Sequence, residues 1–200
     1  MSEVSPTRSA VLEMKDERRA MHEGYVFLDE KCLLLAGEIL RQLERHARLQ
    51  REFVALHQRA LARLQAAVAR HGLNELQIYP PTELARAPLD VAARSLMGVR
   101  LQQAQWSGTD ASAADAVTPS PEAEACRQAF AAVLAAGAQL AAVSGNLERL
   151  SLEYRRSVRR ARALQDVMLP ELDHSIADIE GRLEELEQED AIWMRRGAGR

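Results

Sequence analysis

The longest uninterrupted pattern lies in the first third of the chain. Apolar residues recur there in steps of three and four, and no proline stands between Pro6 and Tyr79. Ser5 and Pro6 resemble an N-cap and a first helical residue, and His71-Gly72 forms a C-terminal stop. This predicts one helix of about 65 residues, roughly 100 Å long. Its expected apolar positions are Val11, Met14, Met21, Tyr25, Leu28, Cys32, Leu35, Ile39, Leu43, Phe53, Leu61, Leu64 and Val68.

A second long helix is predicted to begin at Ser120-Pro121, where Glu122 and Glu124 favour the positive end of the helix dipole. Most of its apolar steps alternate three and four, which is typical of a left-handed coiled coil. Consecutive steps of four break this rhythm at two places, and Pro170 lies inside the second. The expected seam residues are Phe130, Val133, Leu140, Val143, Leu147, Leu150, Tyr154, Val158, Ala161, Leu164, Met168, Leu172, Ile176, Ile179, Leu183, Leu186 and Trp193.

The residues between the two helices have a different character. The stretches LQIYPP (76–81) and RSLMGVRL (94–101) are short and β-capable, and WSGTDASAADAVTPSP (106–121) is a linker of small residues. We therefore expect a first helix over 1–72, a head over 73–119 and a second helix over 120–200. A narrow apolar stripe needs cover from water, and the other helix is the nearest cover. The predicted fold is mainly all-α: a long antiparallel two-helix coiled coil with a small loop or β-hairpin head.

Composition and motifs argue against several classes of function. The net charge of −3 does not suggest a general nucleic-acid binder, and the two cysteines are isolated. The most apolar stretch, residues 129–143, is shorter than a membrane span, so no direct span is expected. There is no phosphate-binding G-x-x-x-x-G-K-[ST] motif, no clustered metal ligands and no nucleophile beside a base. We expect a soluble, cytoplasmic protein that is not an enzyme and has no cofactor or metal.

An arginine-rich run is the first candidate contact site. It can be a solvated helix face, or it can join arginines of the first helix in a positive collar. If the helix ends are level, facing residue numbers sum to about 204, and the two groups lie at one height. A collar would suit acidic loops of a partner better than nucleic acid or anionic lipid. Its members would be Arg155, Arg156, Arg159, Arg160 and Arg162, with Arg41, Arg45 and Arg48.

Two further features stand out. Met97-Gly98-Val99-Arg100 can be a simple turn in which glycine relieves backbone strain, or a contact of the head with a partner. An interior proline costs a helix roughly 3 kcal/mol. Pro170 can therefore be a kink that the neighbouring packing compensates, or it can be a bend that serves the function.

Several segments, in order along the chain, resemble the D subunit of the V-type and archaeal A-type rotary ATPases, the central rotor shaft. They are PTRSAVLEMK (6–15), GYVFLDEK (24–31), LMGVRL (96–101), YRRSVRRARALQDVMLPEL (154–172) and EELEQEDAIWMRR (184–196). The resemblance implies a non-catalytic rotor subunit that couples ATP hydrolysis or synthesis to proton or sodium transport. The implied partners are the catalytic A/B hexamer around the helix termini, the small F subunit of the central stalk, and a membrane-facing subunit above the ion ring, against the head. It also implies a cytoplasmic location, peripheral to the inner or plasma membrane.

Two other functions stay open on the residues alone. The heptad pattern also suits a coiled-coil adaptor or scaffold with no rotary role. The arginine run by itself would suit a DNA-associated helical hairpin, although the net charge disfavours it.

Overall fold

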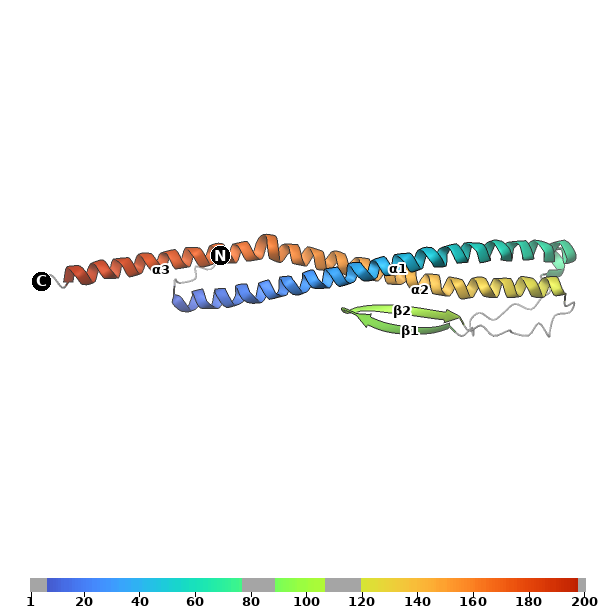
Figure 1. Ribbon diagram of the computed structural model, residues 1–200, viewed down its shortest axis with the longest axis horizontal. Coiled ribbons are helices and arrows are strands. Elements are labelled where there is room, and N and C mark those ends of the chain that lie inside the picture. Colours follow the sequence, from blue (N-terminus) through green and yellow to red (C-terminus); the bar gives the residue numbers. More distant parts are fainter. Residues whose placement is uncertain (1–6, 77–88, 107–119, 198–200) are drawn as a thin grey trace. The chain divides into compact units, whose positions relative to one another are not determined.

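The computed structural model describes residues 7–76, 89–106 and 120–197 (Figure 1). Helix α1 spans Arg8–Leu76, with Gly72 out of helical geometry at φ 72°. The predicted stop at Gly72 is therefore a break in the helix, after which one more helical turn follows. The N-cap is Thr7, whose Oγ1 accepts a hydrogen bond from the Ala10 N–H at 3.2 Å. The predicted Ser5-Pro6 start lies outside the described residues.

The second long helix consists of three consecutive segments. Helix α2 spans Pro121–Ala163, a π-helical turn (η3) spans Leu164–Met168, and helix α3 spans Leu169–Gly197. The predicted start is confirmed, because the Ser120 Oγ accepts a hydrogen bond from the Ala123 N–H at 3.1 Å. The helical path therefore continues through Pro170, with a local change of geometry just before it.

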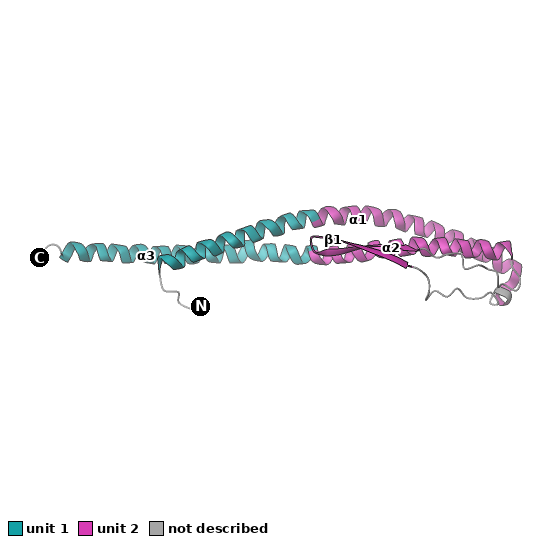
Figure 2. Cartoon of the chain, turned by 90° about the horizontal axis from the view of Figure 1, so that it is seen from below, with its two compact units in different colours: residues 1–34, 154–200 teal, residues 35–153 magenta. Residues whose placement is uncertain are grey.

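The chain divides into two compact units, residues 1–34 with 154–200 and residues 35–153 (Figure 2). In the first unit, the start of α1 packs antiparallel to α3. Three cross-helix ion pairs join the two helices: Arg8–Glu187, Lys15–Glu180 and Arg18–Asp173. Between them lies an apolar cluster of Val11, Ile176 and Ile179, with Met14 and Leu183 packed against it.

In the second unit, α1 and α2 pack through small and medium apolar side chains. Two ring carbons of Phe53 lie 3.4 and 3.9 Å from the place that a Cβ of Gly137 would occupy, so the ring packs against α2 at this glycine. Arg70 pairs with Glu122 at 3.4 Å near the end of the helix pair. The buried apolar residues of this pair include Leu35, Leu49, Ala60, Ala67, Val133, Ala136, Val143 and Leu150.

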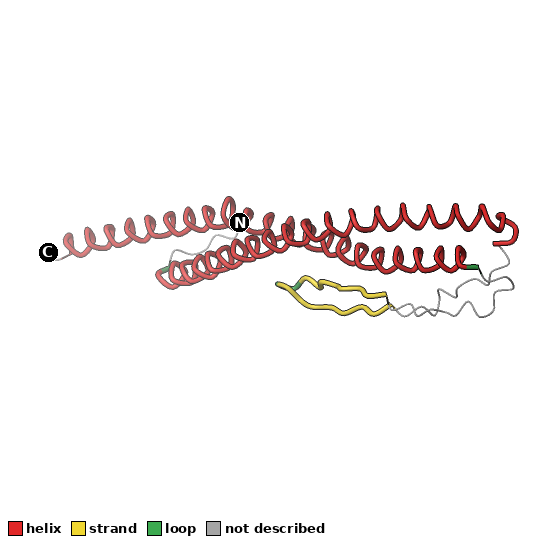
Figure 3. Tube along the Cα trace, turned by 45° about the vertical axis from the view of Figure 1, so that its right-hand side comes forward, coloured by secondary structure: helices red, strands yellow, loops and turns green. Residues whose placement is uncertain are grey.

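A two-stranded antiparallel hairpin completes the second unit. Strand β1 spans Leu89–Leu96 and β2 spans Val99–Trp106, and Figure 3 shows them beside the helices. Both turn residues have positive φ, 47° for Met97 and 85° for Gly98, as a tight hairpin turn requires. The predicted β-capable stretch 94–101 is thus a hairpin turn. The stretch 77–81 and the linker residues 107–119 lie outside the described residues.

The apolar pattern misplaces part of the seam. Leu43 and Leu61 of α1 are 48% and 42% exposed, whereas Gln42 and Ala60 beside them are buried. In the second helix Met168, Leu186 and Trp193 are exposed. Trp193 is exposed because α1 begins at Arg8, which pairs with Glu187, so the last turns of α3 run past the start of α1.

One window of the helical stretch Pro121–Gly197 is long and apolar enough to cross a membrane, with a mean hydropathy of 1.5. A core helix of a soluble protein meets the same length and composition criteria. This window alone therefore assigns no membrane span.

Candidate functional site

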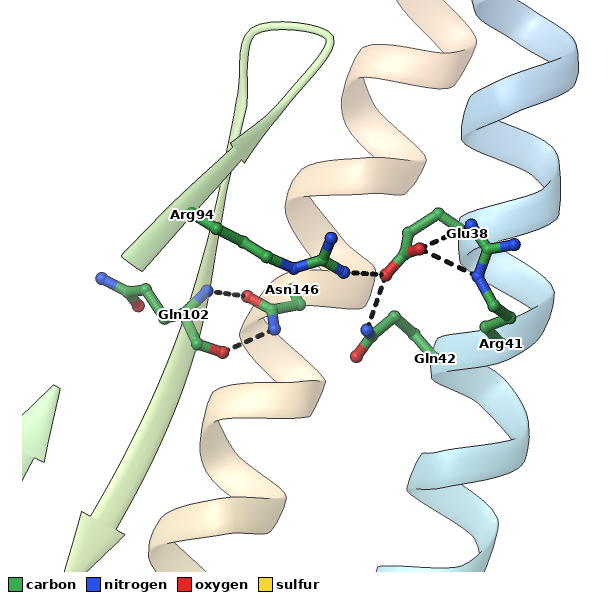
Figure 4. A network of polar contacts seen from close by, with 6 residues as sticks. All are labelled: Glu38, Arg41, Gln42, Arg94, Gln102 and Asn146. Atoms are coloured by element: carbon green, nitrogen blue, oxygen red, sulfur yellow. Dashed lines mark hydrogen bonds and ion pairs between the residues drawn. The ribbon is translucent and has the colours of Figure 1, made fainter. Parts of the chain in front are cut away.

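A buried carboxylate on α1 anchors the hairpin to the helix pair (Figure 4). The Glu38 side chain is only 4% exposed and accepts hydrogen bonds from three groups. Arg94 Nη2 on β1 lies 2.8 Å from Glu38 Oε1, and Gln42 Nε2 lies 2.8 Å from the same oxygen. Arg41 Nη2 lies 2.7 Å from the other oxygen, Oε2. Two arginines thus neutralise one buried carboxylate, and one of them comes from the hairpin.

The surroundings of Glu38 favour its charged form. Burial by itself raises the pKa of this carboxyl, but the hydrogen bonds from Gln42 and Arg41 and the charges of Arg94 and Arg41 outweigh it. The net result is a pKa below the ordinary value of 4.5. The ionised carboxylate therefore stabilises the folded state.

An asparagine on α2 continues the hydrogen bonding of the hairpin. Gln102 of β2 donates its backbone N–H to Asn146 Oδ1 at 2.7 Å, and Asn146 Nδ2 donates to the Gln102 carbonyl at 2.8 Å (Figure 4). The side-chain amide thus meets the strand as a neighbouring strand would. Asn146 is 3% exposed, so both bonds are shielded from water.

Arg149, one turn further along α2, supports this contact. Its Nε donates to the Arg100 carbonyl at 2.9 Å, and its Nη2 donates to Asn146 Oδ1 at 2.7 Å. Asn146 and Arg149 together cover the outer edge of β2. We call the residues Glu38, Arg94, Gln102, Asn146 and Arg149 the hairpin clamp. Polar residues at buried seam positions, such as Glu38 and Gln42, are the sequence signal of this clamp, which the period of the apolar residues does not reveal.

The candidate contact Met97–Arg100 lies at the turn of this clamped hairpin. Val99 is 6% exposed, so its side chain packs inside the protein and is unavailable to a partner. Gly98 and Arg100 are exposed. The turn lies at the level of Arg149, whose guanidinium contacts the Arg100 carbonyl, and not at the end of the helix pair where His71 meets Ser120.

The arginine run is fully displayed on the helix surface. Arg155, Arg156, Arg159, Arg160 and Arg162 are all exposed, and none forms an ion pair within the part of the chain that the structure describes. In the other group, Arg41 pairs with Glu38 and Arg45 is half-buried, while Arg48 is exposed.

The expected register of the collar is wrong. Facing residue numbers sum to 195 for Lys15–Glu180, 191 for Arg18–Asp173 and 192 for Arg70–Glu122, instead of about 204. The reason is that the helix ends are not level, since α3 continues past the start of α1. The two arginine groups also fall in different compact units.

The turn before Pro170 has π-helical geometry. A proline has no N–H, so it cannot bond the carbonyl of Asp166 in an α-helical pattern. The N–H of Leu169 instead donates to the Leu164 carbonyl, five residues earlier. None of the residues of this turn is buried, and Val167 and Met168 are 49% and 39% exposed. The predicted irregularity of the seam is present here.

A second apolar stripe runs along the outer face of α1 in the second unit. Leu40, Ala47, Val54 and Leu61 are spaced by seven residues and exposed, and Leu43 lies beside them. A shallow groove lined by Ala47, Gln50, Arg51 and Val54 lies within this stripe. Strict seven-residue spacing on an exposed face is typical of a surface that packs against a further helix.

Among the described residues, no three His, Cys, Asp or Glu side chains gather as metal ligands. The thiols of Cys32 and Cys126 have a pKa raised by burial, which favours the unreactive protonated form. What the arrangement offers is contact surface: the clamped hairpin, the exposed arginines and the outer stripe.

Comparison with known proteins extends over nearly the whole chain. The family of ATP synthase D subunits matches residues 10–196. The chain is 25% identical to the D subunit of the V-type ATP synthase of Thermotoga neapolitana, over 96% of both chains. It is 27% identical to the D subunit of the A-type ATP synthase of Pyrococcus abyssi, over 96% of this chain and 92% of the relative. The corresponding A-type protein of Methanopyrus kandleri is also 27% identical, over 98% of this chain and 86% of the relative.

Replacing Asn146 by alanine should detach the hairpin edge. The backbone groups of Gln102 lose both partners, and we expect the free energy of unfolding to fall by about 2 kcal/mol. Urea unfolding measures this loss, and hydrogen exchange should show faster exchange of the Gln102 amide. Glu148→Ala, an exposed change on the same helix, is the matched control and should have little effect. An unchanged exchange rate of the Gln102 amide in Asn146→Ala would contradict the role of Asn146 in the hairpin clamp.

Glu38→Gln should change how stability depends on pH. A depressed pKa in the folded state contributes stability above the unfolded value, and this contribution disappears as the pH falls through the folded pKa. Wild type should therefore exceed Glu38→Gln by about 2 kcal/mol at pH 7, and the difference should shrink below pH 4.5. Urea unfolding across pH 7 to 3 measures it. Glu44→Gln, exposed on the same helix, should follow the wild-type curve, and a constant difference for Glu38→Gln would refute the ionised carboxylate.

Proposed function

The chain belongs to the family of ATP synthase D subunits and is a non-catalytic central-stalk subunit of a rotary ATPase, and on that premise we propose that its helix pair transmits torque between a catalytic A/B hexamer and an ion ring. As a subunit of a membrane-associated complex it is peripheral to the membrane. Membership of this family sets aside an adaptor with no rotary role. We further propose that the chain lies on the cytoplasmic side of the inner or plasma membrane.

The end of α3 is the proposed contact with the hexamer. Beyond Glu187, which pairs with Arg8, α3 continues to Gly197, and no helix of the described residues in its unit runs beside that part. Large apolar side chains are exposed on it, with Trp193 at 75% and Met194 at 70%. Exposed apolar side chains of this size on a single helix suit burial in a cavity formed by another protein around the helix. This unpaired end is the observation that supports the proposal most directly.

The exposed arginines are proposed to face acidic loops of the hexamer. The five arginines between Arg155 and Arg162 have no ion-pair partner within the described residues, so their charge is available to another subunit. Of the first-helix group, Arg48 is the best placed to share this role, because Arg41 already neutralises Glu38. Surface charge of this kind guides association and orientation more than it adds affinity.

Two further partners are proposed for the second unit. The outer stripe of α1, from Leu40 to Leu61, would pack against a helix of the small F subunit of the central stalk. The membrane-facing subunit above the ion ring would contact the head, where Met97, Gly98 and Arg100 form the accessible part of the hairpin turn.

The π-helical turn and Pro170 are proposed to shape the shaft. A straight, symmetric rod would present the same face to every catalytic subunit, whereas rotation is transmitted only by an asymmetric one. A π-turn followed by proline is a known cause of helix bending. Here both occur within seven residues, between Leu164 and Pro170.

Reversing two arginines tests the contact with the hexamer. Arg159→Glu with Arg160→Glu should raise the dissociation constant from the hexamer about tenfold and lower the number of ions moved per ATP. The difference should close in about 0.5 M salt, because exposed charges are screened. Binding and coupled transport with a reconstituted complex measure both. Arg59→Glu with Arg63→Glu, exposed on α1, is the control, and equal behaviour of the two double variants would refute a specific contact.

Pro170→Ala tests the shape of the shaft. Alanine restores the N–H that can bond the Asp166 carbonyl, so the stretch should become regular α-helix and gain about 1 to 3 kcal/mol of stability. Coupling of ATP hydrolysis to ion transport should fall while ATP hydrolysis continues. Urea unfolding and coupled transport are the measurements, and Ala177→Ser, an exposed change on α3, is the control. A stabilised variant that is fully coupled would make the bend incidental.

A further inference from the structure

The two outer edges of the hairpin differ in whether their backbone N–H and C=O groups have hydrogen-bond partners. The outer edge of β2 is covered by α2, because Asn146 bonds both backbone groups of Gln102 and Arg149 bonds the Arg100 carbonyl. Within the described residues the sheet has only two strands, so no strand lies on the outer edge of β1. Among the described residues, one edge is therefore closed by side chains and the other is open.

The register shows which groups the open edge presents. Ala93 lies opposite Gln102. Because both backbone groups of Gln102 point away from β1, this pair is of the non-hydrogen-bonded kind, and the groups of Ala93 point outward as well. Alternation along the strand adds Leu89, Val91 and Ser95. Counting back from the two-residue turn, whose flanking pair is Leu96 and Val99, gives the same assignment.

The open edge lacks most of the features that usually protect one, and its two charged residues are Asp90 and Arg94, of which Arg94 is held by Glu38. Natural edge strands are short, or carry lysine, proline or a bulge that discourages pairing. Strand β1 has eight residues, contains no lysine or proline, and pairs with β2 without interruption. The side chains of Leu89 and Val91 are 49% and 51% exposed. The hairpin clamp holds the strand in place, so an incoming strand meets a pre-ordered edge.

We propose that the open edge of β1 accepts an extended segment of a neighbouring subunit by strand addition, within the complex given under the proposed function. The row of backbone donors and acceptors calls for an extended backbone. Exposed Leu89 and Val91 call for apolar residues at alternate positions of the segment. Asp90 has no ion pair within the described residues, which calls for a lysine or arginine opposite it.

A second copy of this chain is the rival occupant. In an antiparallel self-pair centred on Ala92, Arg94 of one copy would lie opposite Asp90 of the other. Arg94 is already held by Glu38 at 2.8 Å, so this charge pairing is not available without opening the clamp. The neighbouring subunit is therefore the better occupant.

Hydrogen exchange on the full chain tests strand addition, first alone and then assembled with the purified subunits of its complex. The outward amides of Leu89, Val91, Ala93 and Ser95 should exchange at least about tenfold more slowly in the assembly, because they gain strand partners. The Gln102 amide serves as an internal control, since it is already bonded in the free chain.

Two substitutions at one position separate backbone from side chain. Val91→Pro removes one outward N–H without touching a bond of the hairpin, and it should weaken binding of the subunit that protects β1 about tenfold. Val91→Ala keeps the N–H and should weaken binding by only about twofold. Retained protection of the Gln103 amide shows that the hairpin stays folded in both variants. Equal binding of Val91→Pro and wild type would overturn the proposal.

The remaining outcomes also decide between hypotheses. A wild-type chain that joins the complex and supports coupled transport, with unchanged β1 exchange, overturns strand addition and leaves the proposed function standing. A chain that does not join the complex overturns both. Concentration-dependent protection of β1 in the free chain, with a dimer mass, assigns the edge to a second copy and overturns the proposal.

Discussion

The described structure depends on the burial of a narrow apolar seam between two antiparallel helices. The seam is built largely from alanine, valine and leucine, and Phe53 packs against Gly137 across it. A thin seam of this kind contributes little burial per residue, so polar contacts decide the register. In the first unit these are three ion pairs across the helices, of which Lys15–Glu180 is one. In the second unit the Arg70–Glu122 pair and the hairpin clamp have that role.

The hairpin clamp also explains how a two-stranded sheet persists in this chain. An isolated hairpin is marginally stable in water and needs a further element against one face or edge. Here the buried Glu38 carboxylate holds β1 through Arg94, and the Asn146 amide holds β2 through the backbone of Gln102. Val99 and Leu101 add apolar contact at the same level. Helix α1 therefore holds the hairpin through a charged side chain, and α2 holds it through a side-chain amide that bonds β2 in place of a third strand.

In this central-stalk subunit, the contacts that stabilise the protein itself and the surfaces available to other subunits are formed by different residues. The seam, the ion pairs and the hairpin clamp are internal and fix the protein's own geometry. The exposed arginines, the end of α3 and the outer stripe of α1 are displayed without partners among the described residues. A shaft that transmits torque needs both, because a contact surface on a deformable segment would deform under load instead of transmitting the rotation.

The sequence by itself determined the helical class, the antiparallel pair, the start at Ser120 and the irregularity near Pro170, and it marked Gly72, where the predicted stop is a break inside a helix that continues to Leu76. Each of these depends on local chemistry or on a strong period. The tertiary structure decided the rest. Periodicity could not tell the seam from the outer stripe, so Leu43 and Leu61 were assigned to the wrong face. Register could not follow from the pattern, because a heptad repeat fits equally well after a shift of seven residues. The hairpin clamp joins Glu38 to Arg94 and Gln102 to Asn146, and such distant partners meet only when the whole chain has folded.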